Sequence, residues 1–119
     1  MIEGPFDGEE AITMMADLDA GATGTMSSAL LPDLLRPVFD HHRAGNRAEA
    51  AKAYAHVLPL VNYENRQCGL RAAKTVMQEG GVIGCDRVRH PMEQIHPATR
   101  EGLLELAREV QPLALSWGK

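Results

Sequence analysis

The sequence is poor in aromatic residues, cysteine and lysine, and each shortage narrows what the protein can be. Aromatic residues make up 4% of the 119 residues. Alanine, leucine and methionine supply much of the apolar content instead, which favours helix. The two cysteines, Cys68 and Cys85, show no spacing typical of a metal or redox site. Since no secretory signal is visible either, we expect two reduced thiols in a cytoplasmic protein.

Long apolar runs and basic blocks are also missing. No stretch approaches the roughly 20 apolar residues of a membrane span, so we expect no membrane insertion. The segment Met1–Pro5 has neither the basic nor the apolar part of a secretory signal. A net charge of −4 without a basic block argues against binding to nucleic acid. The histidines and cysteines form no His-x-x-x-His or Cys-x-x-Cys pattern, so we expect no metal site.

The first 45 residues alternate two short β-prone segments with two helical ones. Residues 2–6 are typical of a strand that ends in a turn, and residues 23–27 of a second brief strand. Between them, Asp7-Gly8-Glu9-Glu10 has the spacing of a capping box, which predicts a helix start, and Gly21 suits the end of that helix. A second helix, ended by Gly45, is predicted by one apolar face: Leu31, Leu34, Leu35, Val38 and Phe39.

Three further helices are predicted after residue 45. Asn46-Arg47-Ala48-Glu49 is a capping box that opens a helix reaching Val61. The next helix carries Leu70, Ala73, Val76 and Met77 on one face and stops at Gly80-Gly81. Residues 82–94 are predicted to form a connecting arm, and the last helix begins near Pro97, because proline is tolerated in a first turn. No repeat or linker divides the chain.

Three separated stretches together resemble the last part of the dihydrodipicolinate synthase / N-acetylneuraminate lyase superfamily. They are Gly21-Ala22-Thr23-Gly24-Thr25-Met26-Ser27, Arg71-Ala72-Ala73-Lys74 and the arm from Arg89 to Ile95. Each motif is weak alone, and their order and spacing carry the resemblance from about Glu3 to Leu113. Members are (β/α)8 barrels that form a Schiff base between a barrel lysine and a 2-keto acid.

The resemblance implies an incomplete TIM barrel, because a complete one needs roughly 250 residues. We expect a single unit, residues 1–119, that is mostly α with two short parallel strands. Residues 1–45 would be the last two βα units of the barrel. Residues 46–119 would be a carboxy-terminal three-helix extension.

Two stretches resemble one branch of the superfamily more than the others. The turn from Glu3 to Glu10 departs from the Ser-Gly-Asp-Asp turn of the synthases, and Asn62–Gln67 lacks the prolines of their Glu-x-Asn-Pro-x-Pro stretch. Both are similar to L-2-keto-3-deoxyarabonate dehydratases. That resemblance implies loss of water from a small 2-keto-3-deoxy acid to give α-ketoglutarate semialdehyde, without cofactor or metal. A dihydrodipicolinate synthase or related pyruvate-dependent aldolase stays open, as does a non-catalytic helical module that self-associates.

The expected nucleophile is not among the residues of this chain. A lysine nucleophile needs a pKa lowered by desolvation or by a nearby cation. The family's Schiff-base lysine and its proton-relay tyrosine lie upstream of the matched stretches. The chain's three lysines, Lys52, Lys74 and Lys119, do not match that lysine, and we expect Lys74 to be structural. We therefore expect no catalytic residue and no activity in this chain alone.

The resemblance places four substrate-binding residues at the strand ends, where TIM barrels carry their chemistry. Asp7 and Gly8 follow the first strand, and Met26 and Ser27 end the second. Simpler roles are open for three of them: Asp7 as a helix N-cap, Met26 as barrel core, and Ser27 with Ser28 as caps of the next helix. We also expect a homo-oligomer, since unpaired strand edges and uncovered apolar faces favour association.

Overall fold

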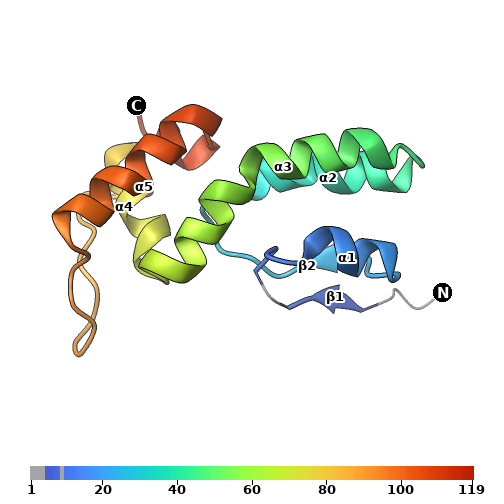
Figure 1. Cartoon of the computed structure of the whole chain (residues 1–119). Coiled ribbons are helices and arrows are strands. Elements are labelled where there is room, and N and C mark those ends of the chain that lie inside the picture. The colour runs from blue at the N-terminus through green and yellow to red at the C-terminus, as the bar shows by residue number, and fades with distance from the viewer. Residues whose placement is uncertain (1–4, 9) are drawn as a thin grey trace.

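The computed structural model describes residues 5–8 and 10–119. Helices form most of this part of the chain, and two short strands lie near its start (Figure 1). The first half contains β1 (Phe6–Asp7), α1 (Met14–Asp19), β2 (Gly24–Thr25) and α2 (Pro32–Arg43). The second half contains α3 (Arg47–Tyr63), the π-helical η1 (Glu64–Cys68), α4 (Arg71–Glu79), α5 (Pro97–Val110) and the 3-10 turn η2 (Leu113–Leu115).

The strands β1 and β2 pair in parallel. Phe6 lies opposite Gly24, and Asp7 lies opposite Thr25. A parallel pair needs a crossover connection, which α1 supplies. The expectation of a mostly helical chain with two short parallel strands is therefore confirmed. The start of the predicted first strand, residues 2–4, lies outside the described residues.

The first helix begins later than the capping-box pattern predicts. That pattern starts a helix after Asp7, whereas α1 begins at Met14 without a side-chain cap. The chain turns first, with φ of 55° at Glu10 and 73° at Ala11, values that no α-helix accommodates. The Asp7 carboxylate instead accepts hydrogen bonds from the Ala11 amide at 2.9 Å and the Thr25 hydroxyl at 2.6 Å. The predicted helix start is wrong because this carboxylate binds the turn at Ala11 and the neighbouring strand at Thr25, and α1 begins only after that turn. Glu9 lies outside the described residues.

Helices α2 and α3 form an antiparallel hairpin (Figure 1). Gly45, with φ of 79°, makes the left-handed turn between them. The Asn46 side chain accepts a hydrogen bond from the Glu49 amide at 3.4 Å, as the capping box predicts. The expected boundaries of this hairpin are confirmed.

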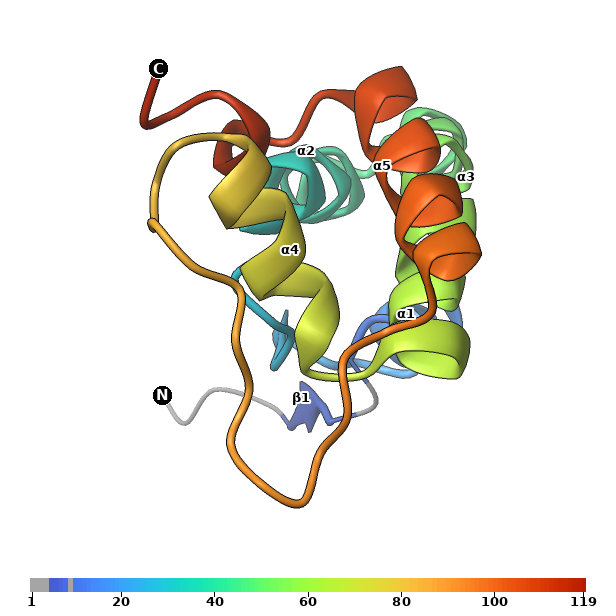
Figure 2. The ribbon, with the colours of Figure 1, turned by 90° about the vertical axis from the view of Figure 1, so that its left-hand side faces the viewer.

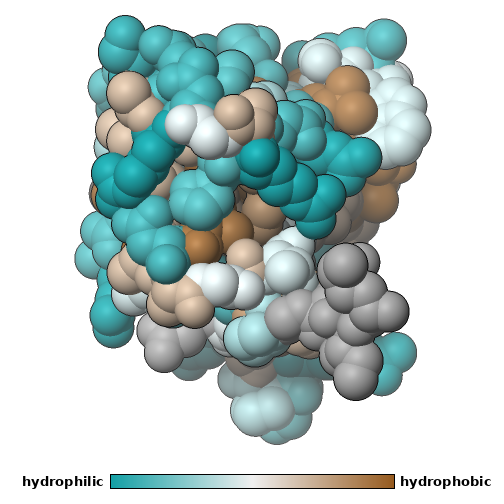
Figure 3. All heavy atoms as spheres, turned by 90° about the vertical axis from the view of Figure 1, so that its right-hand side faces the viewer, coloured by the Kyte–Doolittle hydropathy of each residue, from teal (hydrophilic) through white to brown (hydrophobic). Residues whose placement is uncertain are grey.

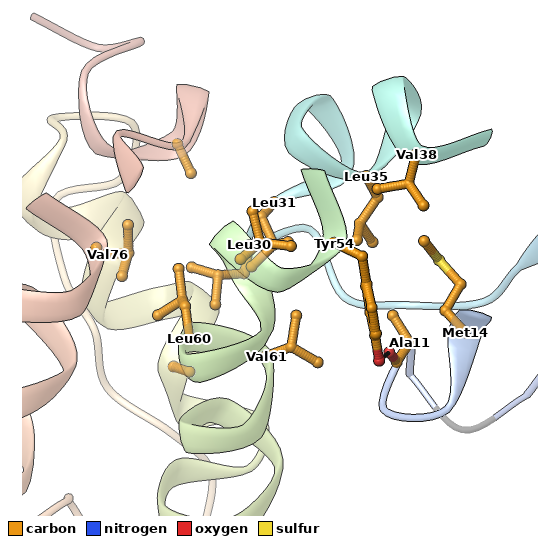
Figure 4. Close-up of a cluster of buried hydrophobic side chains, with 14 of the residues drawn as sticks. Ala11, Met14, Leu30, Leu31, Leu35, Val38, Tyr54, Leu60, Val61 and Val76 are labelled. Atoms are coloured by element: carbon orange, nitrogen blue, oxygen red, sulfur yellow. Dashed lines mark hydrogen bonds between the residues drawn. The ribbon is translucent and has the colours of Figure 1, made fainter. Parts of the chain in front are cut away.

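One part of the core lies between this hairpin and the first segment, and the core continues along α3 to α4 and α5 (Figure 4). Tyr54 extends from α3 toward Ala11 and Met14, and its hydroxyl is 2.5 Å from the carbonyl oxygens of both Ala11 and Ile12. Leu35 and Val38 from α2 are also fully or nearly fully buried. The side chain of Tyr54 therefore connects the hairpin to the turn that follows β1.

Helices α4 and α5 pack at the other end of α3, and the arm between them projects away from the helices (Figure 2). The helix stop at Gly80-Gly81 and the helix start at Pro97 are as predicted. The predicted apolar face of α4 is partly wrong, because Leu70 is 73% exposed. Leu70 precedes the helix, so the buried face consists of Ala72, Thr75 and Val76.

The molecule is elongated, with extents of 42 × 28 × 23 Å. Its radius of gyration, 14.9 Å, exceeds the roughly 13.5 Å typical of a compact chain of this length. The end formed by the α2–α3 connection is mostly hydrophilic, with small hydrophobic patches (Figure 3). Among the described residues, every helix is too short or too polar to cross a bilayer.

Candidate functional site

A cavity of about 560 Å³ opens at the carboxyl ends of β1 and β2. Three of the four residues expected to bind substrate contribute to its wall: Gly8, Met26 and Ser27. The rest of the wall comes from the turn before α1, from the connection between β2 and α2, from η1 and from the two residues that join η1 to α4. These further lining residues are Glu10, Ser28, Glu64, Asn65, Gly69 and Leu70.

Asp7, the fourth expected residue, does not line this cavity. Its side chain is 3% exposed and accepts hydrogen bonds from Thr25 and Ala11. Its carbonyl oxygen also accepts a hydrogen bond from the Met26 amide at 2.8 Å. A buried carboxylate needs such partners, because an unpaired one is costly. Asp7 thus fixes the two strand ends relative to each other, and direct contact between Asp7 and a substrate stays a prediction.

The end of β2 presents one apolar and two hydroxyl side chains. Met26 is 65% exposed, so in this structure it is available to a ligand rather than packed in a core. The serines do not cap the next helix, because the N-cap of α2 is Leu31 and no side chain caps it. Ser28 instead accepts a hydrogen bond from the Leu30 amide at 3.1 Å within a short turn. The capping alternative for Ser27 and Ser28 is therefore wrong.

Glu64 is the site residue that the sequence analysis missed. It is 4% exposed, although it lies in the cavity wall, and it shares a short hydrogen bond with the Ser28 hydroxyl. Burial raises the pKa of the Glu64 carboxyl above its ordinary value. The hydrogen bond from Ser28 opposes this shift, and the nearby negative charge of Glu10 adds to it. A carboxyl group that holds its proton more tightly than usual is a feature of functional sites.

The signal for Glu64 was present in the helical period of the sequence. Val57, Leu60 and Val61 are buried on one face of α3, and position 64 continues that face. A carboxyl group at a core position indicates a partner or a function. The backbone here widens to the π-helix η1, a form that occurs often at functional sites.

The lysines and tyrosines have other partners. Lys74 is exposed and donates a hydrogen bond to the Arg87 carbonyl of the arm at 2.7 Å, as a structural role requires. Lys52 pairs with Glu49 at 3.5 Å, and Lys119 is the last residue. All three lysines lie in the described part of the chain, and none of them lines this cavity. The hydroxyl of Tyr63 donates to the Thr99 carbonyl at 3.0 Å.

Metal-binding side chains do not gather in the described part of the chain. There, no three side chains of histidine, cysteine, aspartate or glutamate come together in a way that could hold a metal ion. The cavity instead offers hydroxyl groups, one buried carboxyl group and apolar surface. Such a wall can bind and orient a small polar molecule through hydrogen bonds.

Residues 5–111 match the dihydrodipicolinate synthetase family. The chain belongs to this family. It is 53% identical over 116 residues to the L-2-keto-3-deoxyarabonate dehydratase of Azospirillum brasilense, an alignment that covers 98% of this chain and 38% of that enzyme. The chain therefore spans well under half the length of this curated relative.

This chain is also similar in structure to part of a solved protein. The crystal structure of dihydrodipicolinate synthase from Rhodopseudomonas palustris superposes with a TM-score of 0.79 at 27% sequence identity. The match covers 86% of this chain and 34% of that one. The resemblance stated from the sequence, with its preference for the dehydratase branch, is confirmed.

Proposed function

We propose that this chain is the carboxy-terminal part of a Schiff-base-forming lyase that dehydrates a 2-keto-3-deoxy sugar acid. The substrate would be L-2-keto-3-deoxyarabonate and the product α-ketoglutarate semialdehyde. Residues 1–45 would supply the last two βα units of a (β/α)8 barrel, and residues 46–119 its helical extension. The lysine nucleophile would come from the units that precede them.

The 53% identity to the dehydratase over almost the whole chain is the observation that carries this proposal. The position of the cavity agrees with it, because the chemistry of TIM barrels takes place at the carboxyl ends of the strands. In this role Gly8, Met26 and Ser27 contribute one side of the substrate pocket, and Asp7 holds the two strand ends together. The chain alone is then expected to bind weakly and to catalyse nothing, since no lysine lines the cavity.

A chimera provides the test. This chain would replace the matching segment of the Azospirillum brasilense dehydratase, and formation of α-ketoglutarate semialdehyde from L-2-keto-3-deoxyarabonate would be followed. We expect turnover within about tenfold of the parent enzyme, a loss of transition-state stabilisation of no more than about 1.4 kcal/mol. A folded chimera without dehydratase activity would contradict the proposal.

The isolated chain is the matched control. After incubation with pyruvate and borohydride, its mass should not change, because a trapped Schiff base requires an accessible, activated lysine. A stoichiometric adduct on Lys74 would show that the chain carries its own nucleophile. The same chimera also separates the alternative function, because condensation of pyruvate with aspartate semialdehyde in place of dehydration would identify a synthase.

A further inference from the structure

The hydroxyl group of Ser28 has three hydrogen-bonding positions, and the structure accounts for two of them. A serine hydroxyl donates one hydrogen and accepts two. The Leu30 amide donates to the Ser28 oxygen at 3.1 Å, which occupies one acceptor position. Glu64 Oε2 occupies a second position. The third hydrogen-bonding position of Ser28 has no partner among these contacts, and Ser28 lines the cavity together with Met26 and Ser27.

The protonation state of Glu64 decides which position is left. An ionised carboxylate can only accept, so Ser28 would donate its hydrogen to Glu64 and could only accept a hydrogen bond from the cavity. A protonated Glu64 donates to Ser28 instead. Both acceptor positions of Ser28 are then filled, and its hydrogen is free to point into the cavity.

We propose that Ser28 donates its hydroxyl hydrogen to an oxygen atom of the bound 2-keto-3-deoxy acid, and that neutral Glu64 is the positioning residue that holds Ser28 in this orientation. The proposal rests on the function proposed above and names a specificity element of the same pocket. Glu64 does not touch the substrate in this role. It sets the direction in which Ser28 donates.

The groups around Glu64 favour the neutral form. Its side chain is 4% exposed, and burial raises its pKa. Glu10, in the turn after β1, adds a negative charge that acts in the same direction. Within η1 the neighbouring Cys68 is buried, and burial raises the pKa of its thiol, so it contributes no charge near neutral pH. Arg71, at the start of α4, directs its guanidinium to the carbonyl oxygens of Cys68 and Glu93.

The test uses the chimera and a pair of substitutions with opposite expectations. Glu64→Gln keeps a donor toward Ser28, because a side-chain amide donates as a protonated carboxyl group does. We expect its KM to stay within about twofold of the unsubstituted chimera at low pH, and to become independent of pH. Glu64→Ala and Ser28→Ala should each raise KM about tenfold, the worth of one hydrogen bond, and should leave kcat within about twofold.

Two further variants complete the set. The double variant with both alanines should have the KM of either single variant, because the two residues act on one contact. Gln67→Ala is the matched control, since Gln67 is exposed on the same π-helical turn and lines no part of this cavity. Its KM should not change. Equal losses in Glu64→Gln and Glu64→Ala, or the same dependence of KM on pH with and without Glu64, would overturn the proposal.

A measurement on the isolated chain separates this inference from the function. The amide of Leu30 donates to Ser28, so its nitrogen chemical shift should follow the ionisation of Glu64 as pH rises. The shift should stop following pH in Glu64→Gln and in Ser28→Ala. A Leu30 amide that titrates unchanged in both variants would refute the pairing, whatever the chimera does. Absence of dehydration together with a coupled titration would refute the function and leave the pair in place.

Discussion

The hydroxyl of Tyr54 lies 2.5 Å from the carbonyl oxygen of Ala11, across 43 residues of sequence. The second carbonyl in its reach, that of Ile12, is at the same distance. This contact joins the middle of α3 to the turn that precedes α1. That turn carries Glu10, a residue of the cavity wall, so Tyr54 positions part of the site without lining it.

Tyr54→Phe should destabilise the chain by about 1–3 kcal/mol, because it removes the hydroxyl donor that the carbonyl oxygens of Ala11 and Ile12 share at a largely buried contact. Urea unfolding followed by circular dichroism measures the change. Tyr63→Phe is the matched control, since Tyr63 also donates to one backbone carbonyl but is only partly buried. Its loss should be about 0.5–1.5 kcal/mol. An equal or larger loss for Tyr63→Phe would contradict the role given to Tyr54.

Glu64 should make the chain less stable as pH rises. Its pKa in the folded state lies above the ordinary value of 4.5, which applies to the unfolded chain. Between these two values the folded state holds a proton that the unfolded state has lost, so the free energy of unfolding falls with increasing pH. The stabilisation from Glu64 is fully present below pH 4.5, and it is lost as the pH rises through the pKa of Glu64 in the folded state. Unfolding in urea at a series of pH values should give a flatter profile for Glu64→Gln, and superimposable profiles would refute the shift.

Asp19 should titrate at unusually low pH. Arg47 donates hydrogen bonds to both oxygens of its carboxylate and His42 lies 3.1 Å away, which together lower the pKa of Asp19 to about 2. This exposed cluster stabilises the folded state at pH values above 3.8, the ordinary pKa of the Asp19 carboxyl group. The stabilisation is lost as the pH falls to the pKa of Asp19 in the folded state, about 2.

Carbon-detected NMR of the carboxyl group measures the Asp19 pKa directly. Arg47→Ala should return it toward 3.8, and His42→Ala should shift it less, because the hydrogen bond from Arg47 is the largest cause. A larger shift in His42→Ala than in Arg47→Ala would reverse this ranking. High salt should narrow the difference between the variants, since exposed charges are screened.

Gly80 allows the carboxy-terminal turn η2 to approach α4. A β-carbon at this position would lie 2.5 Å from the carbonyl carbon of Leu115, and backbone atoms cannot give way cheaply. Gly80→Ala should therefore cost about 1–3 kcal/mol of stability. Gly84→Ala, in the arm, meets no atom within 4 Å and should change stability by less than about 0.5 kcal/mol. Thermal unfolding of both variants makes the comparison, and equal melting temperatures would contradict it.

The isolated chain should self-associate through the strand ends. Phe6 and Met26 are both more than half exposed there, and the chain is less compact than its length allows. Light scattering at micromolar concentration should report a dimer or larger, and Met26→Lys should shift the protein toward monomer. Ala48→Lys, at the hydrophilic end of the α2–α3 hairpin, is the control and should leave the oligomeric state unchanged. A well-behaved monomer of 13.0 kDa would contradict this prediction.

The helix boundaries that could be predicted from the sequence are those set by short-range signals. Asn46 and Glu49 define the start of α3, Gly80-Gly81 the end of α4, and Pro97 the start of α5, because each signal acts within one turn of helix. The family resemblance adds the order of the strands and the place of Gly8, Met26 and Ser27.

The features that escaped prediction join residues far apart in the sequence. Asp7 has the spacing of a helix cap, and besides the nearby Ala11 amide its carboxylate also accepts from Thr25, 18 residues later. Ser28 and Glu64 are 36 residues apart, and neither has a local pattern that names the other. Leu70 continues an apolar period by coincidence, because the helix begins one residue after it. Hydrophobic periodicity indicates which residues lie on the same face of a helix. It does not indicate which distant element packs against that face.

The contacts of the α2–α3 hairpin are formed by segments joined through one tight turn, whereas the strand pair and Tyr54 bring together more distant segments. Local contacts cost less chain entropy, so the hairpin should form early and the segment 5–30 should dock last and open first. Hydrogen exchange of its amides should accordingly be the fastest among the ordered elements. Because this segment supplies half of the cavity wall, any ligand of the cavity would slow that exchange, and the least stable part of the chain would report binding.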